Sequence, residues 1–380
     1  MEIEHEEHSP DADGSACRSR LETVYESSAR KKKLFITATV LLLVAATIVS
    51  LSIGSVDIPV TDTLRAIGHA LLPSAIAGPE RYWYSQIVIN SRMSRVLLCI
   101  LCGISLAIAG TVMQGLLRNP LVSPFTLGLS SAASFGAAMA IVFGGTVTGY
   151  VLVFGIKFYA ENLLIAVMAF LCGLASISLV LLLSRRSDIS RSTIILAGVV
   201  ISYLFQAGVS LTKYLSDDDA LREITLWLMG GMWNATWSVD LIVLPVVVAV
   251  FLLLWSMSVR INVLSAGDDV AESLGIDMVK LRRNGLILSA LVTSVCIAFT
   301  GIIGFIGLMA PHLCRMVIGN DTRYLLPASA ALGALILLVS DTLARMVIRP
   351  EELPVGILMY LLGGTFFIWL ITRKKKDVSV

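Results

Sequence analysis

The chain has 380 residues, of which 56% are hydrophobic and 15% are charged, and its formal net charge at pH 7 is +2. A mean hydropathy of +0.85 excludes an ordinary soluble globular protein, and the small net charge does not indicate a nucleic-acid partner. We therefore expect an all-α polytopic membrane protein that is surrounded by a lipid bilayer.

The first 33 residues differ from the rest of the chain. Residues 1–29 are rich in Glu, Asp, Ser and His, which predicts a disordered acidic tail. Residues 30–33 are all basic and form a stop before the first apolar run. The six cysteines lie mostly inside apolar runs without acidic or histidine neighbours, so we expect no disulfide framework, no metal site and no cofactor.

Residues 34–373 are predicted to form a single transmembrane domain of about ten helices, followed by a short cytoplasmic tail over residues 374–380. The expected spans are residues 34–53, 95–117, 125–143, 162–183, 193–214, 240–258, 284–301, 304–318, 325–345 and 355–372.

The second span ends in a polar break. No charged residue occurs between Val96 and Leu117, and the break is Arg118-Asn119-Pro120. Because Asn119 precedes a proline, it is biased away from helix, so the span should stop there. Irregular backbone at membrane depth persists only inside protein or beside water. The break therefore indicates either a path or gate, or simply the link between two packed spans.

The basic residues of the short links predict the orientation. They fall on the side of both termini, whereas the acidic run 217–219 falls on the opposite side. Because basic residues are retained in cytoplasmic links, both termini are expected in the cytoplasm.

Four arginines depart from this rule and are expected at the outer ends of spans, namely Arg92, Arg95, Arg345 and Arg349. Arg345 also follows Asp341 by four residues, a spacing that forms ion pairs on a helix. The arginines suit either snorkelling to lipid headgroups or docking of an acidic partner.

The polar segment 260–283 is the best candidate for contact with a cytoplasmic partner. Val270 and Leu274 would share one face of a short helix, and Gly275 would end it. A surface helix without a partner would show the same pattern. The sequence has no Gly-x-x-x-x-Gly-Lys-Ser/Thr loop, so the chain is not expected to be an ATPase or another enzyme.

Several separate motifs resemble the FecCD-type permeases, the membrane subunits of ABC importers for iron–siderophore, haem and cobalamin. The motifs are SRMSRV (91–96), AGTVMQGLLRNPLVSP (109–124), LWLMGG (226–231), GDDVAESLGI (267–276), GFIGLMAPHLCR (304–315), SDTLAR (340–345) and EELPVGI (351–357). They occur in the family's order, and the resemblance runs from about residue 34 to the C-terminus.

The resemblance implies the type II ABC importer architecture in the cell membrane of a prokaryote. It implies a homodimer with a path along the dimer axis, two ATPase subunits on the cytoplasmic side and a binding protein that delivers the substrate outside. By position, Arg92, Arg95 and Arg345 would dock the binding protein.

The same resemblance assigns residues at the cytoplasmic side. The coupling contact would involve Gly267, Asp268, Ala271, Leu274 and Gly275. The cytoplasmic gate would involve Asn119, Leu121 and Ser192.

An iron–siderophore chelate is the expected substrate, with cobalamin, haem or an oxyanion as alternatives. A carrier that works alone and is driven by an ion gradient, or a membrane scaffold without transport activity, would be the competing classes.

Overall fold

The computed structural model describes residues 10–54, 56–74, 78–144, 147–153, 155–184 and 191–374. Of residues 10–27 it describes the helical backbone without the side chains. The predicted acidic tail falls largely on this part and on residues 1–9, and most of the predicted C-terminal tail lies beyond residue 374. Both therefore stay predictions, although the bounds of the first helix reach back to Pro10.

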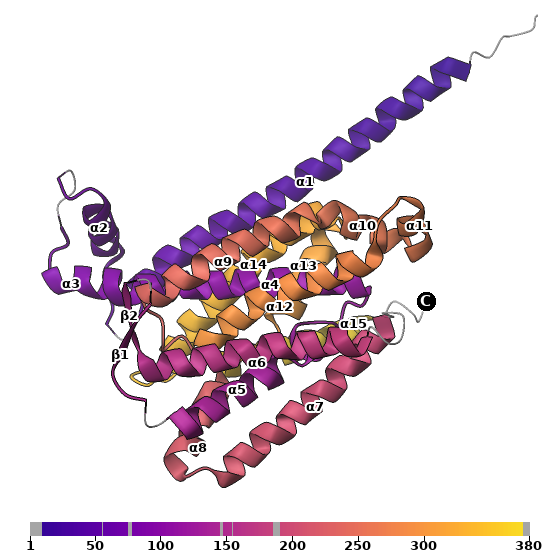
Figure 1. Ribbon diagram of the computed structural model, residues 1–380. Helices are drawn as coiled ribbons and strands as arrows, with labels where there is room; N and C mark the ends of the chain where they lie inside the picture. Colours follow the sequence, from indigo (N-terminus) through magenta and orange to yellow (C-terminus); the bar gives the residue numbers. More distant parts are fainter. Residues whose placement is uncertain are drawn as a thin grey trace, which may run out of the picture.

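The ten predicted spans are confirmed as helices (Figure 1). Among the described residues, eight helices are long and apolar enough to cross a bilayer, and two shorter apolar helices complete the set. The ten are α1 (Pro10–Ser52), α4 (Ser94–Leu117), α5 (Leu129–Gly144), α6 (Ala160–Ser184), α7 (Arg191–Leu215), α9 (Trp237–Ser256), α12 (Met278–Thr300), α13 (Ile306–Ile318), α14 (Thr322–Val347) and α15 (Val355–Lys374).

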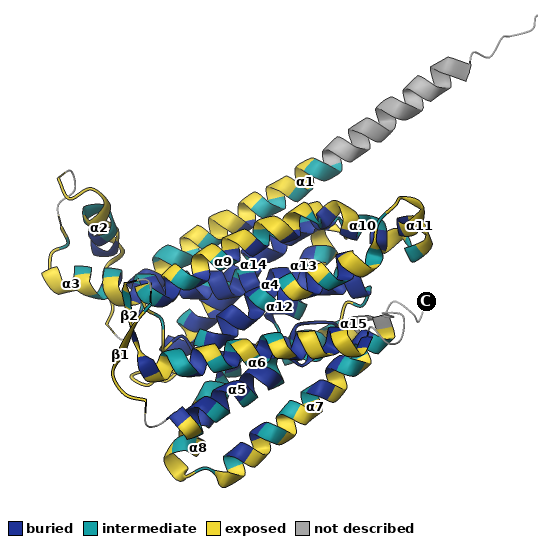
Figure 2. Cartoon of the chain, in the orientation of Figure 1, coloured by how far each residue is buried: buried dark blue, intermediate teal, exposed yellow. Residues whose placement is uncertain are grey.

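Helix α4 forms the centre of the bundle and is buried along most of its length (Figure 2). It packs against α9, α12, α13 and α14. Two of its glycines allow this, because a Cβ atom on Gly110 would lie 1.9 Å from the carbonyl oxygen of Gly307, and one on Gly103 would lie 2.5 Å from that of Gly333. Small residues let helix backbones approach closely where lipid removes the hydrophobic drive for association.

Short elements that the sequence did not predict gather at one end of the bundle, which we call the outer end (Figure 1). They are α2 (Val60–Leu71), α3 (Tyr82–Gln86), the π-helical turn η1 (Ile87–Met93), the antiparallel strands β1 (Tyr150–Val153) and β2 (Ile156–Tyr159), and α8 (Asp218–Met229). Asp217, expected in a link, instead caps α8, since its carboxylate accepts the Ala220 N–H at 2.9 Å.

The opposite end, called the inner end, carries α10 (Ser258–Ala266) and α11 (Asp268–Ser273). The C-terminal end of α15 and the N-terminal part of α1 lie toward this same end (Figure 1). Helix α12 begins at Met278 rather than at the predicted residue 284, because the Asp277 carboxylate accepts the Lys280 N–H at 2.9 Å and caps the helix there. A 3₁₀ turn, η2 (Phe125–Leu127), lies between α4 and α5.

Candidate functional site

The polar break after α4 is a defined turn at the inner end. Arg118 adopts a left-handed conformation with φ of 48° and terminates the helix, while the Asn119 N–H donates to the Gln114 carbonyl at 3.2 Å. The Asn119 side chain accepts the N–H of Leu121 at 2.9 Å. Two of the three predicted gate residues therefore belong to one turn.

Ser192, the third predicted gate residue, lies on a different element. It is the second residue of α7 and its side chain is exposed. Leu121 is 62% exposed at the tip of the Asn119 turn. The gate role of the three residues remains a prediction.

Asp268 joins the polar turn to the inner-end helices. Its carboxylate lies 3.0 Å from Arg282 of α12 and 3.5 Å from Arg118 at the end of α4. Arg118 also donates through Nε to the carbonyl oxygen of Leu264 in α10, at 2.7 Å. One carboxylate and one carbonyl thus connect α10 and α11 to two spans of the bundle.

The predicted coupling residues build the geometry of α11. Gly267, with φ of 146°, separates α10 from α11, and Gly275, with φ of 73°, follows the end of α11. The Gly275 N–H donates to Glu272 at 2.9 Å and the Ile276 N–H donates to Ala271 at 3.0 Å, which is the double bond pattern that closes a helix at a left-handed glycine.

The two faces of α11 differ sharply in exposure. Ala271 is fully buried against the bundle, whereas Val270 is 43% and Leu274 is 64% exposed. The short helix is therefore anchored on one side and presents apolar side chains on the other.

At the outer end, a second carboxylate lies between two arginines. Asp341 of α14 is fully buried, and its oxygens lie 2.9 Å from Arg95 of α4 and 3.0 Å from Arg345 one turn later on α14. The ion pair expected from the spacing of Asp341 and Arg345 is confirmed. Arg345 also donates to the Ser50 hydroxyl at 2.7 Å, and Arg95 contacts the Glu352 carboxylate at 2.6 Å.

Arg92 is buried as well, and it donates to the carbonyl oxygens of Leu51 at 2.7 Å, Ser52 at 2.9 Å and Val56. All three predicted docking arginines therefore lie at the outer end with their guanidinium groups bound within the chain. Arg95, whose side chain is 15% exposed and which pairs with the part-exposed Glu352, is the most accessible of them. Their docking role stays a prediction.

A hollow of about 520 Å³, which we call the polar hollow for its hydroxyl and amide groups, opens where η2, α5, α7, α13 and α15 meet, and apolar side chains such as Phe305 and Leu308 also line it. None of its lining residues was among the predicted site residues, although Ser123, Leu228, Gly304, Phe305 and Leu308 lie in the motifs that carry the family resemblance. Its polar lining comes from hydroxyl and amide side chains, without a charged residue among the lining side chains. These are Ser123, Thr126, Ser130, Ser131, Ser134, Gln206 and Tyr360. The serines of the run GLSSAAS (128–134) are the sequence feature that could have indicated this lining.

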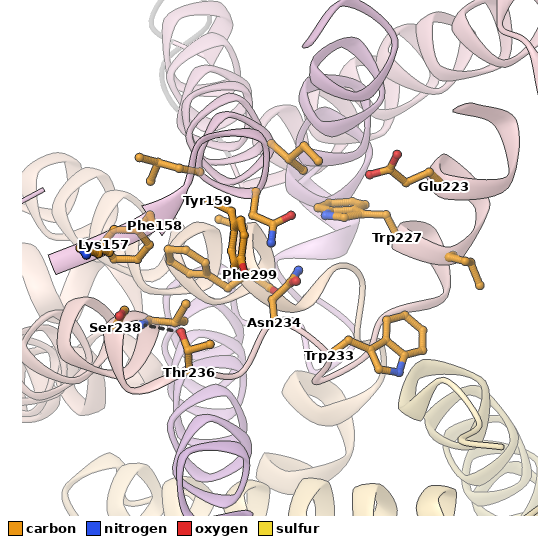
Figure 3. A pocket seen from close by; sticks show the side chains of 16 residues that line it. Lys157, Phe158, Tyr159, Glu223, Trp227, Trp233, Asn234, Thr236, Ser238 and Phe299 are labelled. Atoms are coloured by element: carbon orange, nitrogen blue, oxygen red, sulfur yellow. Dashed lines mark hydrogen bonds between the residues drawn. The ribbon is translucent and has the colours of Figure 1, made fainter. Parts of the chain in front are cut away.

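A second cavity, of about 440 Å³, lies at the outer end between β2, α6, α8, α9 and α12 (Figure 3). Aromatic rings line its middle, including Tyr159, Trp227 and Phe299, while Lys157 and Glu223 lie at opposite sides (Figure 3). Burial, together with the nearby Glu161 carboxylate, raises the pKa of Glu223 above its ordinary value. Tryptophan and tyrosine at this level suit the boundary between membrane and water.

Ten packed apolar helices with short polar elements at both ends define the class of protein, a multi-pass α-helical membrane protein. The model of the FecCD transport family matches residues 42–373, so the chain belongs to that family.

Individual relatives agree with this assignment. The hemin transport system permease protein HmuU of Yersinia pestis is 39% identical over 300 residues, which cover 79% of this chain and 86% of the relative. The Fe(3+) dicitrate transport system permease protein FecD of Escherichia coli is 34% identical over 344 residues, which cover 90% and 98%.

A solved structure of an ABC transporter in an inward-facing conformation is also similar. It aligns with a TM-score of 0.76 and 31% identity over 89% of this chain and 98% of that one. The chain is therefore a membrane permease of the ABC importer type.

Proposed function

We propose that the chain is the membrane-spanning subunit of an importer for a metal chelate, with an iron–siderophore complex as the first candidate and haem or cobalamin as alternatives. Two copies form the path, two separate ATPase subunits bind at the inner end, and an extracytoplasmic binding protein delivers the substrate at the outer end. The inner end then faces the cytoplasm of a prokaryotic cell, together with both termini.

The observation that carries this proposal is the connection made by Asp268. A partner that binds exposed Val270 and Leu274 would move α11 together with the part of the bundle that it contacts, because buried Ala271 packs this helix against the bundle. Asp268 passes the movement to Arg118 at the polar turn, where the ion-pair distance is 3.5 Å. A subunit whose conformation is changed by a separate ATPase requires such a contact between the helix that binds the ATPase and the turn beside the translocation path.

The uncharged lining of the polar hollow supports a chelate as the substrate. Hydroxyl and amide groups offer neutral hydrogen bonds, which suit a metal whose charge its ligand already shields. A polar hollow on a flank that faces lipid would be unfavourable. A second copy placed against α5, α7 and α15 would remove it from lipid, which supports the homodimer.

At the outer end, Arg95 is the side chain best placed to meet an acidic binding protein. Its contact with Glu352 is part-exposed, so a carboxylate of the partner can replace that contact while Asp341 continues to hold the other side of the guanidinium. Arg92 and Arg345 would position the surrounding backbone rather than meet the partner directly.

The transport assignment is tested by reconstituting the chain with its ATPase subunits and binding protein in vesicles. We expect uptake of the chelate that requires ATP and the binding protein. Uptake that continues without ATP and collapses with an ionophore would instead identify a carrier driven by an ion gradient. ATP hydrolysis without chelate uptake would reject the transport assignment.

The coupling assignment is tested separately with Leu274→Ser. We expect ATPase stimulation and uptake to fall together, because the apolar contact of α11 with the partner is lost. Val317→Ser is the matched control, since Val317 is 63% exposed on α13. Equal uptake by the two variants would contradict a coupling role for α11.

A further inference from the structure

A third cavity, of about 420 Å³, lies at the inner end beside the polar turn. Its lining includes two arginines, Arg118 and Arg315, but no carboxylate. Amide and hydroxyl groups complete it, from Asn119, Asn320, Thr111 and Ser265 among others. Its volume falls within the range of about 300–1,000 Å³ that is usual for small-molecule sites.

Arg315 of α13 is half-buried, yet it has no ion-pair partner among the residues that the structure describes. Its guanidinium donates to the Gln114 side-chain oxygen, and Gln114 is held in turn because its amide donates to the Gly307 carbonyl at 2.9 Å. Buried charges in proteins are normally paired, because an unpaired charge loses the solvation that water provides.

The carboxylates nearest in sequence to the lining residues are already engaged. Asp321, next to Asn320, lies 2.8 Å from Arg323 and 3.7 Å from Lys32. Asp268 is shared between Arg118 and Arg282, with its shorter contact to Arg282. The cavity therefore keeps an excess of positive charge that these groups do not neutralise.

We propose that this cavity is a binding site for a phosphate-type oxyanion. Guanidinium groups bind phosphate oxygens through paired, charge-assisted hydrogen bonds, and the amides and hydroxyls supply neutral donors for the remaining oxygens. The oxyanion can be a free phosphate group from the inner side or the phosphate of an anionic lipid headgroup. Both sources present the same chemistry to Arg315 and Arg118.

A bound oxyanion would also affect the ion pair between Asp268 and Arg118. An oxyanion attracts Arg118 and competes with Asp268 for it, since their ion-pair distance of 3.5 Å is the longer of the two that Asp268 makes. The site would then modulate how tightly α11 is connected to α4. This consequence rests on the proposed function, whereas binding of the oxyanion does not.

The test measures binding in the purified full-length chain, without any transport assay. Thermal unfolding of delipidated protein is followed with inorganic phosphate against chloride at equal ionic strength. Native mass spectrometry counts lipids that remain after extraction from vesicles of equal phosphatidylglycerol and phosphatidylcholine. The variants are Arg315→Gln, Asn320→Asp, which adds a negative charge to the lining, and the control Arg260→Gln at an exposed position of α10.

We expect phosphate to stabilise the wild-type chain and the Arg260→Gln control, with an affinity about tenfold or more weaker in Arg315→Gln and Asn320→Asp. Retention of phosphatidylglycerol that depends on Arg315 would support the proposal with lipid as the source, and a phosphate shift alone would support a free oxyanion. Equal responses of all variants, or no response to either probe, would overturn the proposal. Asn320→Asp keeps the test valid if Arg315→Gln fails to fold.

Discussion

The two ends of this molecule use the same chemical arrangement, one carboxylate between two arginines, in different surroundings. At the outer end Asp341 is fully buried between Arg95 and Arg345. At the inner end the side chain of Asp268 is 30% exposed between Arg118 and Arg282. Burial makes removal of a partner costly, whereas exposed pairs are screened by water and contribute little. The outer cluster therefore holds spans together, and we expect the inner cluster to exchange partners more readily than the outer one.

The largest effect is expected from Asp341→Asn, which leaves two arginines near the core without their shared carboxylate. We expect the free energy of unfolding to fall by about 3–5 kcal/mol, the usual cost of breaking a buried ion pair. Denaturant unfolding in detergent measures it. Asp57→Asn is the control, because the Asp57 side chain is 71% exposed in its pair with Arg349 and should cost about 1 kcal/mol or less. Similar losses of unfolding free energy in the two variants would contradict the claim that burial determines the cost of breaking the ion pair.

Asp268→Asn should separate stability from function at the inner end. The unfolding free energy should fall by only about 1 kcal/mol, because the carboxylate is partly solvated. The partner ATPase should nevertheless hydrolyse ATP without the corresponding uptake of substrate, because α11 no longer contacts Arg118 through Asp268. ATPase and uptake assays on one reconstituted sample check this. If ATP hydrolysis still drives uptake normally in Asp268→Asn, the proposed role of the inner cluster in transmitting movement is contradicted.

Glu352→Gln sharpens the docking proposal at the outer end. Releasing Arg95 from its exposed partner should strengthen association with an acidic binding protein by about two- to fivefold, the equivalent of a typical exposed ion pair. Titration of the binding protein at low and high salt measures the change, which should shrink as salt screens the charges. Weaker association in the variant would show that Glu352, rather than Arg95, meets the partner.

The smallest effect concerns Asp321 at the inner end. Burial acts to raise the pKa of this carboxyl, but hydrogen bonds from Arg323 and Asn262 outweigh it and lower the pKa to about 2. Because the folded pKa lies below the ordinary value of 3.8, the carboxylate stabilises the fold above about pH 4, and this contribution is lost as the pH falls toward 2. The stability difference between the wild type and Asp321→Asn should shrink over that range. A constant difference would contradict the assignment.

The spans were predictable because their signals are local. Uncharged runs of bilayer length and the Arg118-Asn119-Pro120 break occur within short windows of sequence, and so does the Asp341–Arg345 spacing. The amphipathic elements between spans were missed, since α2, α8 and the β1–β2 hairpin are short and their polar residues resemble those of links. The serines of the polar hollow were missed because small polar residues serve packing and lining equally well.

By itself, the sequence determined a multi-pass helical permease, its membership of a motif-rich family and the positions of its breaks, because apolar length and residue order are properties of the chain alone. The tertiary structure decided which charges meet. Arg95 and Asp341 are 246 residues apart and Arg118 and Leu264 are 146 apart. Close packing of α4 against α14 at Gly103 and against α10 at Gly115 brings these groups together, and the burial of each cluster of charges depends on that packing.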